Sequence, residues 1–276
     1  MADTNPIQVD DFLPAERREK IMEWFATNQV ASSQELAKRL NTSISTIRRD
    51  LDYLASQGIV RRTHGGAVRV RRNTTYEPLV EEARQTSVEE KRAIAAAAAK
   101  LLQPEQSILI DSRSTLHQFA HAVADLAIPL TVVTNDVHVA YILANKPHIK
   151  LVVPGGICRH GAYSLLGETG INFVRELRCD HFFLSSQAVD TECVSDTSLE
   201  LVQLQKAMIG AAAETTLLVD SSKFGSRTIY RTAPIESVTR IITDEGLDPE
   251  ERAKYSQLVP QFVIAPYVDE LQEETE

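Results

Sequence analysis

The chain has 276 residues, 43% of them hydrophobic and 24% charged, a length that accommodates one small domain and one larger domain with its own core. No apolar run is long enough to cross a membrane and the acidic first residues are unlike a signal peptide, so we expect a cytoplasmic protein without membrane contact. The formal net charge of −9 argues against a protein that coats nucleic acid, and three cysteines without a CxxC pair indicate neither a disulfide framework nor a zinc site.

The charge is distributed unevenly along the chain. Residues 1–75 hold 12 Lys and Arg against 9 Asp and Glu, a net of +3, so residues 76–276 hold a net of −12. An acidic remainder repels DNA and confines contact to the N-terminal end. The distribution therefore favours a modular DNA-binding protein.

The N-terminal domain is predicted to span residues 15–70. After an aperiodic start, a first helix is expected from about Ala15 to Thr27. Within it Ile21, Trp24 and Phe25 are spaced to pack against the next two helices, so the single Trp is predicted to lie in the core.

Two short helices with a tight turn between them follow. Ser32 and Glu35 form a capping box for the first of the pair, and Ser43 is placed to cap the second. The apolar residues that recur on the buried face of the second helix are Ile47, Leu51 and Leu54. Gly58 is expected to end this helix.

Residues 59–70 read as strand, Gly65-Gly66 turn and strand, which completes a winged helix-turn-helix. The first turns of the second helix would enter the major groove, where Arg can contact guanine, and the hairpin would lie along the phosphates. The residues that this motif predicts to contact DNA are Ser33, Ser43, Ser45, Thr46, Arg48, Arg49, Arg61, Arg62 and His64. An amphipathic helical pair with solvated arginines is the alternative, because such pairs are common on helix surfaces.

Residues 42–67, TSISTIRRDLDYLASQGIVRRTHGGA, closely resemble the DNA-binding signature of the DeoR family of bacterial sugar-metabolism regulators. The resemblance implies a transcriptional regulator that binds double-stranded operator DNA.

Beyond a linker at residues 71–75, a second domain is predicted over 76–265, followed by an acidic tail at 266–276. Buried strands are expected at 107–111, 130–135, 150–156, 181–186, 214–222 and 239–244, and helices at 91–102, 117–126 and 137–145. This alternation predicts a three-layer α/β domain with a mostly parallel sheet, whose ligands bind beyond the carboxyl ends of the strands.

Polar loops follow several of these strands, at residues 111–115, 134–136, 154–156 and 220–225. Hydroxyl and backbone N–H groups at the start of a helix suit a phosphate, and Asp and Asn suit sugar hydroxyls. Each loop alone is weak support, because Gly, Ser and Asp are ordinary turn residues.

The order of these loops resembles the sensor domain of the DeoR family, which is similar to the sugar-phosphate isomerase fold. By that resemblance Ser114 and Thr115 would hold a phosphate, Asp111, Asn135 and Asp196 would meet hydroxyls, and Lys223 would pair with charge. The residues so predicted to bind an effector are Asp111, Ser112, Arg113, Ser114, Thr115, Asn135, Gly155, Gly156, Asp196, Glu200 and Lys223.

The sequence departs from the family pattern at two positions. Arg113 stands where the first loop usually has glycine, and Cys193 stands where glycine often precedes an Asp-containing segment. The Arg113 side chain would either crowd a phosphate or bind it through two hydrogen bonds.

Other candidate sites are weaker. His117 and His121 are four apart, as zinc ligands can be, but without an HExxH pattern, and we expect no metal and no cofactor. Asp196 and Glu200 could form the acid/base pair of an isomerase, but a polar strand-to-helix junction is the favoured interpretation. The cysteines, Cys158, Cys179 and Cys193, are expected to be buried thiols.

Three functions compete. The first is a homodimeric or homotetrameric repressor of a sugar or sugar-phosphate catabolic operon that a phosphorylated sugar-type effector relieves. The second is a sugar-phosphate isomerase with an accessory DNA-binding module, and the third a nucleoid-type protein. A nucleoid protein needs no large pocketed domain and an isomerase needs no residues 15–70, so the regulator is favoured.

Overall fold

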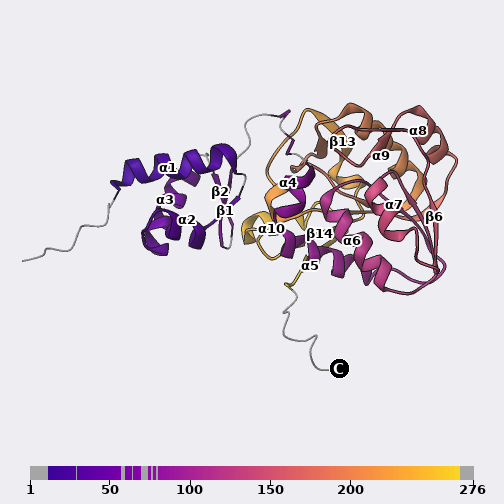
Figure 1. Ribbon diagram of the computed structural model, residues 1–276, viewed down its shortest axis with the longest axis horizontal. Helices are drawn as coiled ribbons and strands as arrows, with labels where there is room; N and C mark the ends of the chain where they lie inside the picture. The colour runs from indigo at the N-terminus through magenta and orange to yellow at the C-terminus, as the bar shows by residue number, and fades with distance from the viewer. Residues whose placement is uncertain are drawn as a thin grey trace, which may run out of the picture. The chain divides into compact units, whose positions relative to one another are not determined.

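The structure is a computed structural model that describes residues 12–28, 30–56, 60–63, 65–69, 74–75, 77–78 and 80–267. The chain divides into two compact units, Met1–Val70 and Arg71–Glu276 (Figure 1). Within the described ranges, no helix combines the length and apolar character that a bilayer span requires. His64, the Gly58 cap, residues 71–73 of the predicted linker and the tail beyond residue 267 lie outside the described residues.

Serine side chains cap the starts of the second and third helices of the first unit, as predicted. The helices are α1 (Pro14–Thr27), α2 (Ser33–Arg39) and α3 (Ile44–Ser56). Ser32 Oγ accepts a hydrogen bond from Glu35 N–H at 3.0 Å, and Ser43 Oγ accepts one from Thr46 N–H at 3.1 Å. Each bond satisfies a backbone donor that an α-helix leaves free at its N-terminus, so the serine determines where the helix begins.

The core of the first unit contains the predicted face of α3. Ile47, Leu51 and Leu54 are all buried. An ion pair also ties α1 to α3, because the buried carboxylate of Asp50 accepts hydrogen bonds from Arg17 Nε at 2.5 Å and Arg18 Nε at 2.9 Å.

The prediction that Trp24 lies in the core is wrong. Ile21 and Phe25 are fully buried, but Trp24 is half-buried, and the Arg39 guanidinium lies 4.6 Å from the centre of its ring. Helical spacing identified the correct side of α1, but Trp24 lies at the edge of that side, where the indole covers the core without leaving water entirely.

The wing contains a strand that the sequence did not reveal. The predicted hairpin is formed by β2 (Val60–Arg62) and β3 (Gly66–Arg69), and β1 (Val30–Ser32) adds to it in the antiparallel order β1-β3-β2. At the β1–β3 contact a Cβ on Gly66 would lie 1.9 Å from the carbonyl oxygen of Ala31, so only glycine permits this pairing.

The second unit is built on a seven-stranded parallel sheet with the order β15-β14-β12-β9-β4-β5-β6. Its strands are β4 (Ser107–Ile110), β5 (Leu130–Thr134), β6 (Ile149–Val152), β9 (Cys179–Leu184), β12 (Ala212–Leu218), β14 (Arg240–Asp244) and β15 (Gln261–Ala265). Six of these strands were predicted, and β15 was not.

Helices cover both faces of the sheet, which confirms the three-layer α/β fold (Figure 1). Their bounds are α4 (Val80–Gln85), α5 (Val88–Ala99), α6 (Ser114–Asp125), α7 (Val137–Leu143), α8 (Glu168–Arg175), α9 (Leu199–Ala211) and α10 (Pro249–Tyr255). Successive side chains of a strand point to opposite faces of the sheet. Ile108 and Ile110 of β4 therefore pack with α5, α6 and α7, whereas Leu109 packs with α8 and α9.

Two small antiparallel sheets complete the described part of this unit. One pairs β7 (Ile157–Cys158) with β8 (Leu165–Leu166), and the other joins β10 (Ala188–Val189), β11 (Cys193–Asp196) and β13 (Tyr230–Pro234). The prediction for the cysteines is wrong at one position, since Cys179 and Cys193 are buried but Cys158 is exposed on the short hairpin.

Candidate functional site

The start of α3 presents a polar, basic surface to solvent. Ser45, Arg48 and Arg49 are exposed, Thr46 is half-buried, and Ile47 between them points into the core. The Ser43 hydroxyl lies 2.8 Å from the hydroxyl oxygens of both Ser45 and Thr46. The arrangement can place two guanidinium groups in a groove beside a short cluster of hydroxyls.

Of the side chains predicted to contact DNA, Ser33 is buried and Arg62 is paired within the first unit. Ser33 is 3% exposed, so its hydroxyl is closed off from a phosphate, and this prediction is corrected. Arg62 Nε pairs with Asp52 at 2.7 Å and its NH1 donates to the Gly66 carbonyl at 2.5 Å, so it braces the wing against α3. Arg61 is half-buried on β2.

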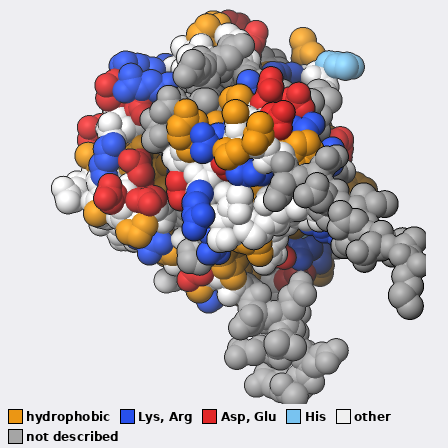
Figure 2. Space-filling model, turned by 90° about the vertical axis from the view of Figure 1, so that its left-hand side faces the viewer, with side chains coloured by type: hydrophobic (Ala, Val, Ile, Leu, Met, Phe, Trp, Pro, Cys, Tyr) orange, Lys and Arg blue, Asp and Glu red, His pale blue; other side chains and the backbone are white. Residues whose placement is uncertain are grey.

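Charge alone does not mark a binding surface on the face that Figure 2 shows. Figure 2 shows one face, on which Lys and Arg side chains lie among Asp and Glu side chains with hydrophobic groups between them. The first 75 residues are basic in net charge and the rest are acidic in net charge, but on this face the charges of both signs are mixed.

In the second unit, strand register brings the predicted polar residues together. Ile110 of β4 lies beside Thr134 of β5 and Phe183 of β9, so the residues that follow these strands meet at one edge. Asp111 follows β4 directly and Asn135 follows β5 directly. Both are buried, at 0% and 1% exposure.

Asp111 is held inside the protein by a neutral partner. Gln205 Nε2 on α9 donates to Asp111 Oδ2 at 2.8 Å, and Thr232 donates to Gln205 Oε1 at 3.1 Å. Complete burial raises the pKa of Asp111 to about 7, although the Gln205 hydrogen bond and the nearby Arg113 charge act in the opposite direction. Asp111 therefore changes its protonation close to neutral pH.

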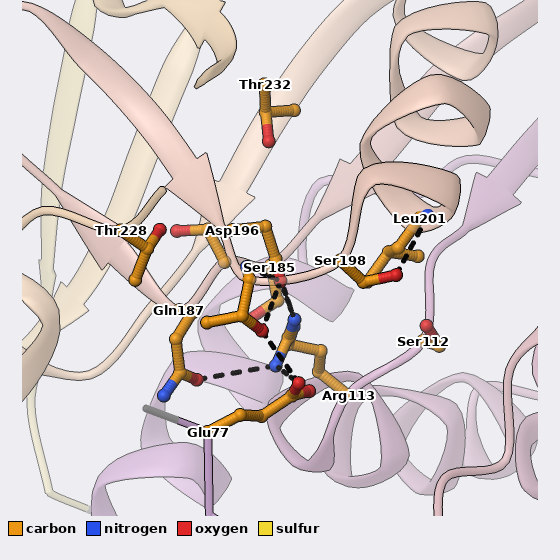
Figure 3. Close-up of polar contacts among 12 residues, drawn as sticks. Glu77, Ser112, Arg113, Ser185, Gln187, Asp196, Ser198, Leu201, Thr228 and Thr232 are labelled. Atoms are coloured by element: carbon orange, nitrogen blue, oxygen red, sulfur yellow. Dashed lines mark hydrogen bonds and ion pairs between the residues drawn. The ribbon is translucent and has the colours of Figure 1, made fainter. Parts of the chain in front are cut away.

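Arg113 lies at the N-cap of α6 and points into this buried space (Figure 3). Its NH2 donates to both carboxylate oxygens of Asp196 at 2.5 Å, and its NH1 lies 3.5 Å from Glu77 and 3.4 Å from the amide oxygen of Gln187. The backbone φ of Arg113 is 157°, in a region that glycine adopts more readily than other residues. An arginine thus occupies a glycine-like backbone position and sends its guanidinium across the site.

Sequence reasoning missed the residues that complete this cluster. Glu77 binds Arg159 in a two-pronged pair, with distances of 3.0 Å from NH1 and 2.7 Å from NH2, and accepts a hydrogen bond from the Thr197 hydroxyl at 2.7 Å. Burial raises the pKa of Glu77, but Arg159 and Arg113 outweigh it and lower the value to about 2. In the sequence, only Arg113 pointed to such residues, because a buried arginine requires carboxylate partners.

The side-chain amide of Asn135 is buried without a hydrogen-bond partner among the described residues. This holds for both its oxygen and its nitrogen. Buried amide groups are seldom left without partners in folded proteins. At the end of a parallel strand, this amide is suited to bind a ligand that carries both donors and acceptors, as a sugar hydroxyl does.

The other predicted effector residues include those of the loops that follow β4 and β6. Ser112 and Thr115 are buried and Ser114 is half-buried at the start of α6, while Gly155 and Gly156 follow the edge strand β6. Glu200 is exposed on α9 and accepts a hydrogen bond from the Ser198 hydroxyl at 3.2 Å, and Lys223 pairs with Asp220 at 3.3 Å. For these two residues effector binding stays a prediction.

The two histidines of the predicted pair lie in different surroundings. His117 is buried and its Nε2 lies 3.0 Å from Asp136 Oδ2, whereas His121 is exposed. Over the residues that the structure describes, no group of three His, Cys, Asp or Glu side chains is arranged to hold a metal ion. Asp136 also caps α7 by accepting from His138 and Val139 N–H, so the His117–Asp136 pair has a structural role.

Each of the two units matches a known protein family. Residues 17–73 match the DeoR-like helix-turn-helix domain, and residues 86–245 match the DeoR C terminal sensor domain. The chain is 35% identical over 86% of its length to the HTH-type transcriptional regulator YulB of Bacillus subtilis, with 91% of that protein covered.

Two further relatives carry a regulatory description. The L-fucose operon activator of Haemophilus influenzae is 33% identical over 87% of this chain and 96% of its own length. The HTH-type transcriptional repressor CsqR of Escherichia coli is 30% identical over 83% of this chain and 87% of its own length.

Proposed function

Because the chain belongs to the DeoR family of transcriptional regulators, we propose that it represses a sugar or sugar-phosphate catabolic operon and that a phosphorylated sugar-type effector relieves this repression. The observation that carries the effector part is the unpartnered Asn135 amide beside Asp111, at the strand ends that Arg113 enters. One relative, named as an L-fucose operon activator, supports the carbohydrate link, and the repressor name of another relative supports the direction.

DNA reading belongs to α3 in this proposal. Arg48 and Arg49 contact base edges, with Ser45 and Thr46 beside them, because these residues occupy the exposed first turns of the helix. One such helix covers only a few base pairs. The active form is therefore a homodimer or homotetramer joined through the sensor unit, and light scattering at concentrations that saturate operator binding should give at least twice the 30.7 kDa of one chain.

The isomerase alternative fits the site less well. Such an enzyme needs a carboxylate that is free to take a proton from its substrate. Asp196 is instead neutralised by Arg113, and Glu200 lies exposed outside the cluster. The proposed function is thus that of a regulator and not an enzyme.

The decisive experiment measures DNA binding and its response to ligands together. Fluorescence anisotropy with DNA from upstream of the protein's own gene, compared with a scrambled duplex, tests sequence preference. A panel of sugar phosphates and the matching neutral sugars is then added at fixed protein concentration. Release of the specific DNA by a phosphorylated sugar supports the proposal, whereas equal binding to both duplexes, or isomerisation of a panel member, contradicts it.

A further inference from the structure

One carboxylate already fills the most basic position of the candidate site. Glu77 faces Arg113 (Figure 3). Both of its oxygens are engaged, Oε1 by Arg113 and Arg159 and Oε2 by Arg159 and the Thr197 hydroxyl. Its side chain is 18% exposed. Two guanidinium groups and a hydroxyl converging on one carboxylate form the set of donors that proteins use to bind a ligand's phosphate or carboxylate.

Glu77 is part of residues 74–87, the segment that joins the first unit to α5. It follows closely in sequence on the boundary between Val70 and Arg71. The same segment is held at a second point, where Ile229 N–H donates to the Thr74 carbonyl at 3.0 Å. Ile229 immediately precedes β13, which pairs with β11, the strand that carries Asp196. The segment is therefore bound to the same structural elements that form the site.

We propose that Glu77 is an internal competitor of the effector, and that an oxyanion group of the effector displaces it from Arg113 and Arg159 and so releases the segment that leads to the DNA-binding unit. This inference rests on the proposed function and adds its regulation. It also defines the effector chemistry as a polyhydroxy compound with at least one phosphate or carboxylate, because the group that it replaces is a carboxylate.

Displacement is physically reasonable because one oxyanion replaces another. Arg113 keeps its two bonds to Asp196, and neither arginine is left without a negative partner. The segment can hold only one of two arrangements, with Glu77 bound or with the effector bound. The effector then changes DNA affinity only as far as it prefers the second arrangement.

Glu77→Gln tests the competitor directly, since it removes the charge and keeps the shape. Glu81→Gln is the matched control, because Glu81 lies in the same segment and binds Tyr163 and Arg84 but not Arg113. Isothermal titration of the full-length proteins uses inorganic phosphate, ribose 5-phosphate, gluconate and neutral ribose as probes. Inorganic phosphate tests the oxyanion alone, and the two sugar derivatives distinguish a phosphate from a carboxylate source.

We expect Glu77→Gln to bind at least one oxyanion probe at least about tenfold more tightly than the native protein, because a site that is mostly occupied by its own carboxylate loses that fraction of its affinity. Glu81→Gln should stay within about twofold of the native protein, and ribose should show no gain. Hydrogen exchange of residues 74–87 should rise in Glu77→Gln without ligand, and in the native protein only when the probe is bound.

The outcomes separate the two proposals. If a probe binds the native protein and Glu77→Gln binds it equally or more weakly, the competitor is refuted and the proposed function stands. If no probe binds either protein, the effector part of the proposed function and the competitor both fail. Unchanged hydrogen exchange of residues 74–87 on probe binding also refutes release of the segment, whatever the affinities.

Discussion

Arg113 NH2 donates to both carboxylate oxygens of Asp196 at 2.5 Å, which joins the start of α6 to the end of β11 across the carboxyl edge of the parallel sheet. By the sequence resemblance, Arg113 stands where the family loop is expected to have glycine, and Asp196 is predicted to meet a hydroxyl. The pair therefore changes the chemistry of the site, because a carboxylate expected to meet a sugar is already neutralised by the protein itself.

Arg113→Gly is expected to weaken binding of the natural effector by about 10- to 100-fold, since charged hydrogen bonds contribute about 1.5–3 kcal/mol. Glycine relieves the backbone at φ 157° but removes the guanidinium that faces the oxyanion. Arg113→Lys is the matched control, because it keeps the charge and loses the planar fork. Isothermal titration with the effector checks this, and tighter binding by the glycine variant would show instead that Arg113 excludes the ligand.

Arg49→Ala on α3 is expected to cost about 1–3 kcal/mol of specific operator binding and little binding to scrambled DNA. Arg49 is exposed beside Arg48 in the first turns of the helix. Lys100→Ala removes one exposed positive charge from the second unit and serves as the control for charge alone. Anisotropy on both duplexes measures the difference, and an equal loss on both would assign Arg49 to the phosphates.

Asp50→Ala is expected to destabilise the first unit by about 3–5 kcal/mol, because it leaves the buried Arg17 without its carboxylate. Asp52→Ala removes an acidic side chain from the same helix that is 64% exposed, and it should cost less than about 1 kcal/mol. Thermal unfolding followed by the fluorescence of Trp24, on the adjoining α1, reports on this unit. Equal unfolding temperatures for the two variants would show that the Asp50 ion pairs do not stabilise the contact between α1 and α3.

Asp111→Asn is expected to change the dependence of stability on pH. The pKa of Asp111 is raised from 3.8 to about 7, so the native protein favours the protonated form and its contribution to stability is present at low pH and lost as pH rises through 7. Relative to the native protein, the free energy of unfolding of the asparagine variant, which stays neutral, should rise by about 3 kcal/mol between pH 5 and pH 8, because only the two pH units between pH 5 and the folded-state pKa of about 7 contribute.

Urea unfolding at both pH values measures this difference, and Asp125→Asn, an exposed aspartate at the end of α6, is the control. A constant difference between Asp111→Asn and the native protein across this range would mean that Asp111 is ionised throughout.

Local physics explains what the sequence by itself determined. The serine caps at positions 32 and 43, the buried face of α3 and six strands of the parallel sheet follow from side-chain periodicity and from the few residue types that start a helix. The strand-end positions of Asp111 and Asn135 follow as well, because polar residues directly after buried strands in a parallel sheet must meet at one edge.

Only the tertiary structure decided which of those side chains face one another. Glu77, Arg113, Arg159 and Asp196 come from four separate parts of the chain and meet through side-chain contacts, which leave no spacing pattern in the sequence. The third wing strand was hidden for a similar reason, because three residues show too little alternation to mark a strand, and Val30–Ser32 becomes one only by pairing with β3. For Glu200 and Lys223 the residue types were visible in the sequence, but only the structure shows their local contacts, with Ser198 and Asp220 respectively.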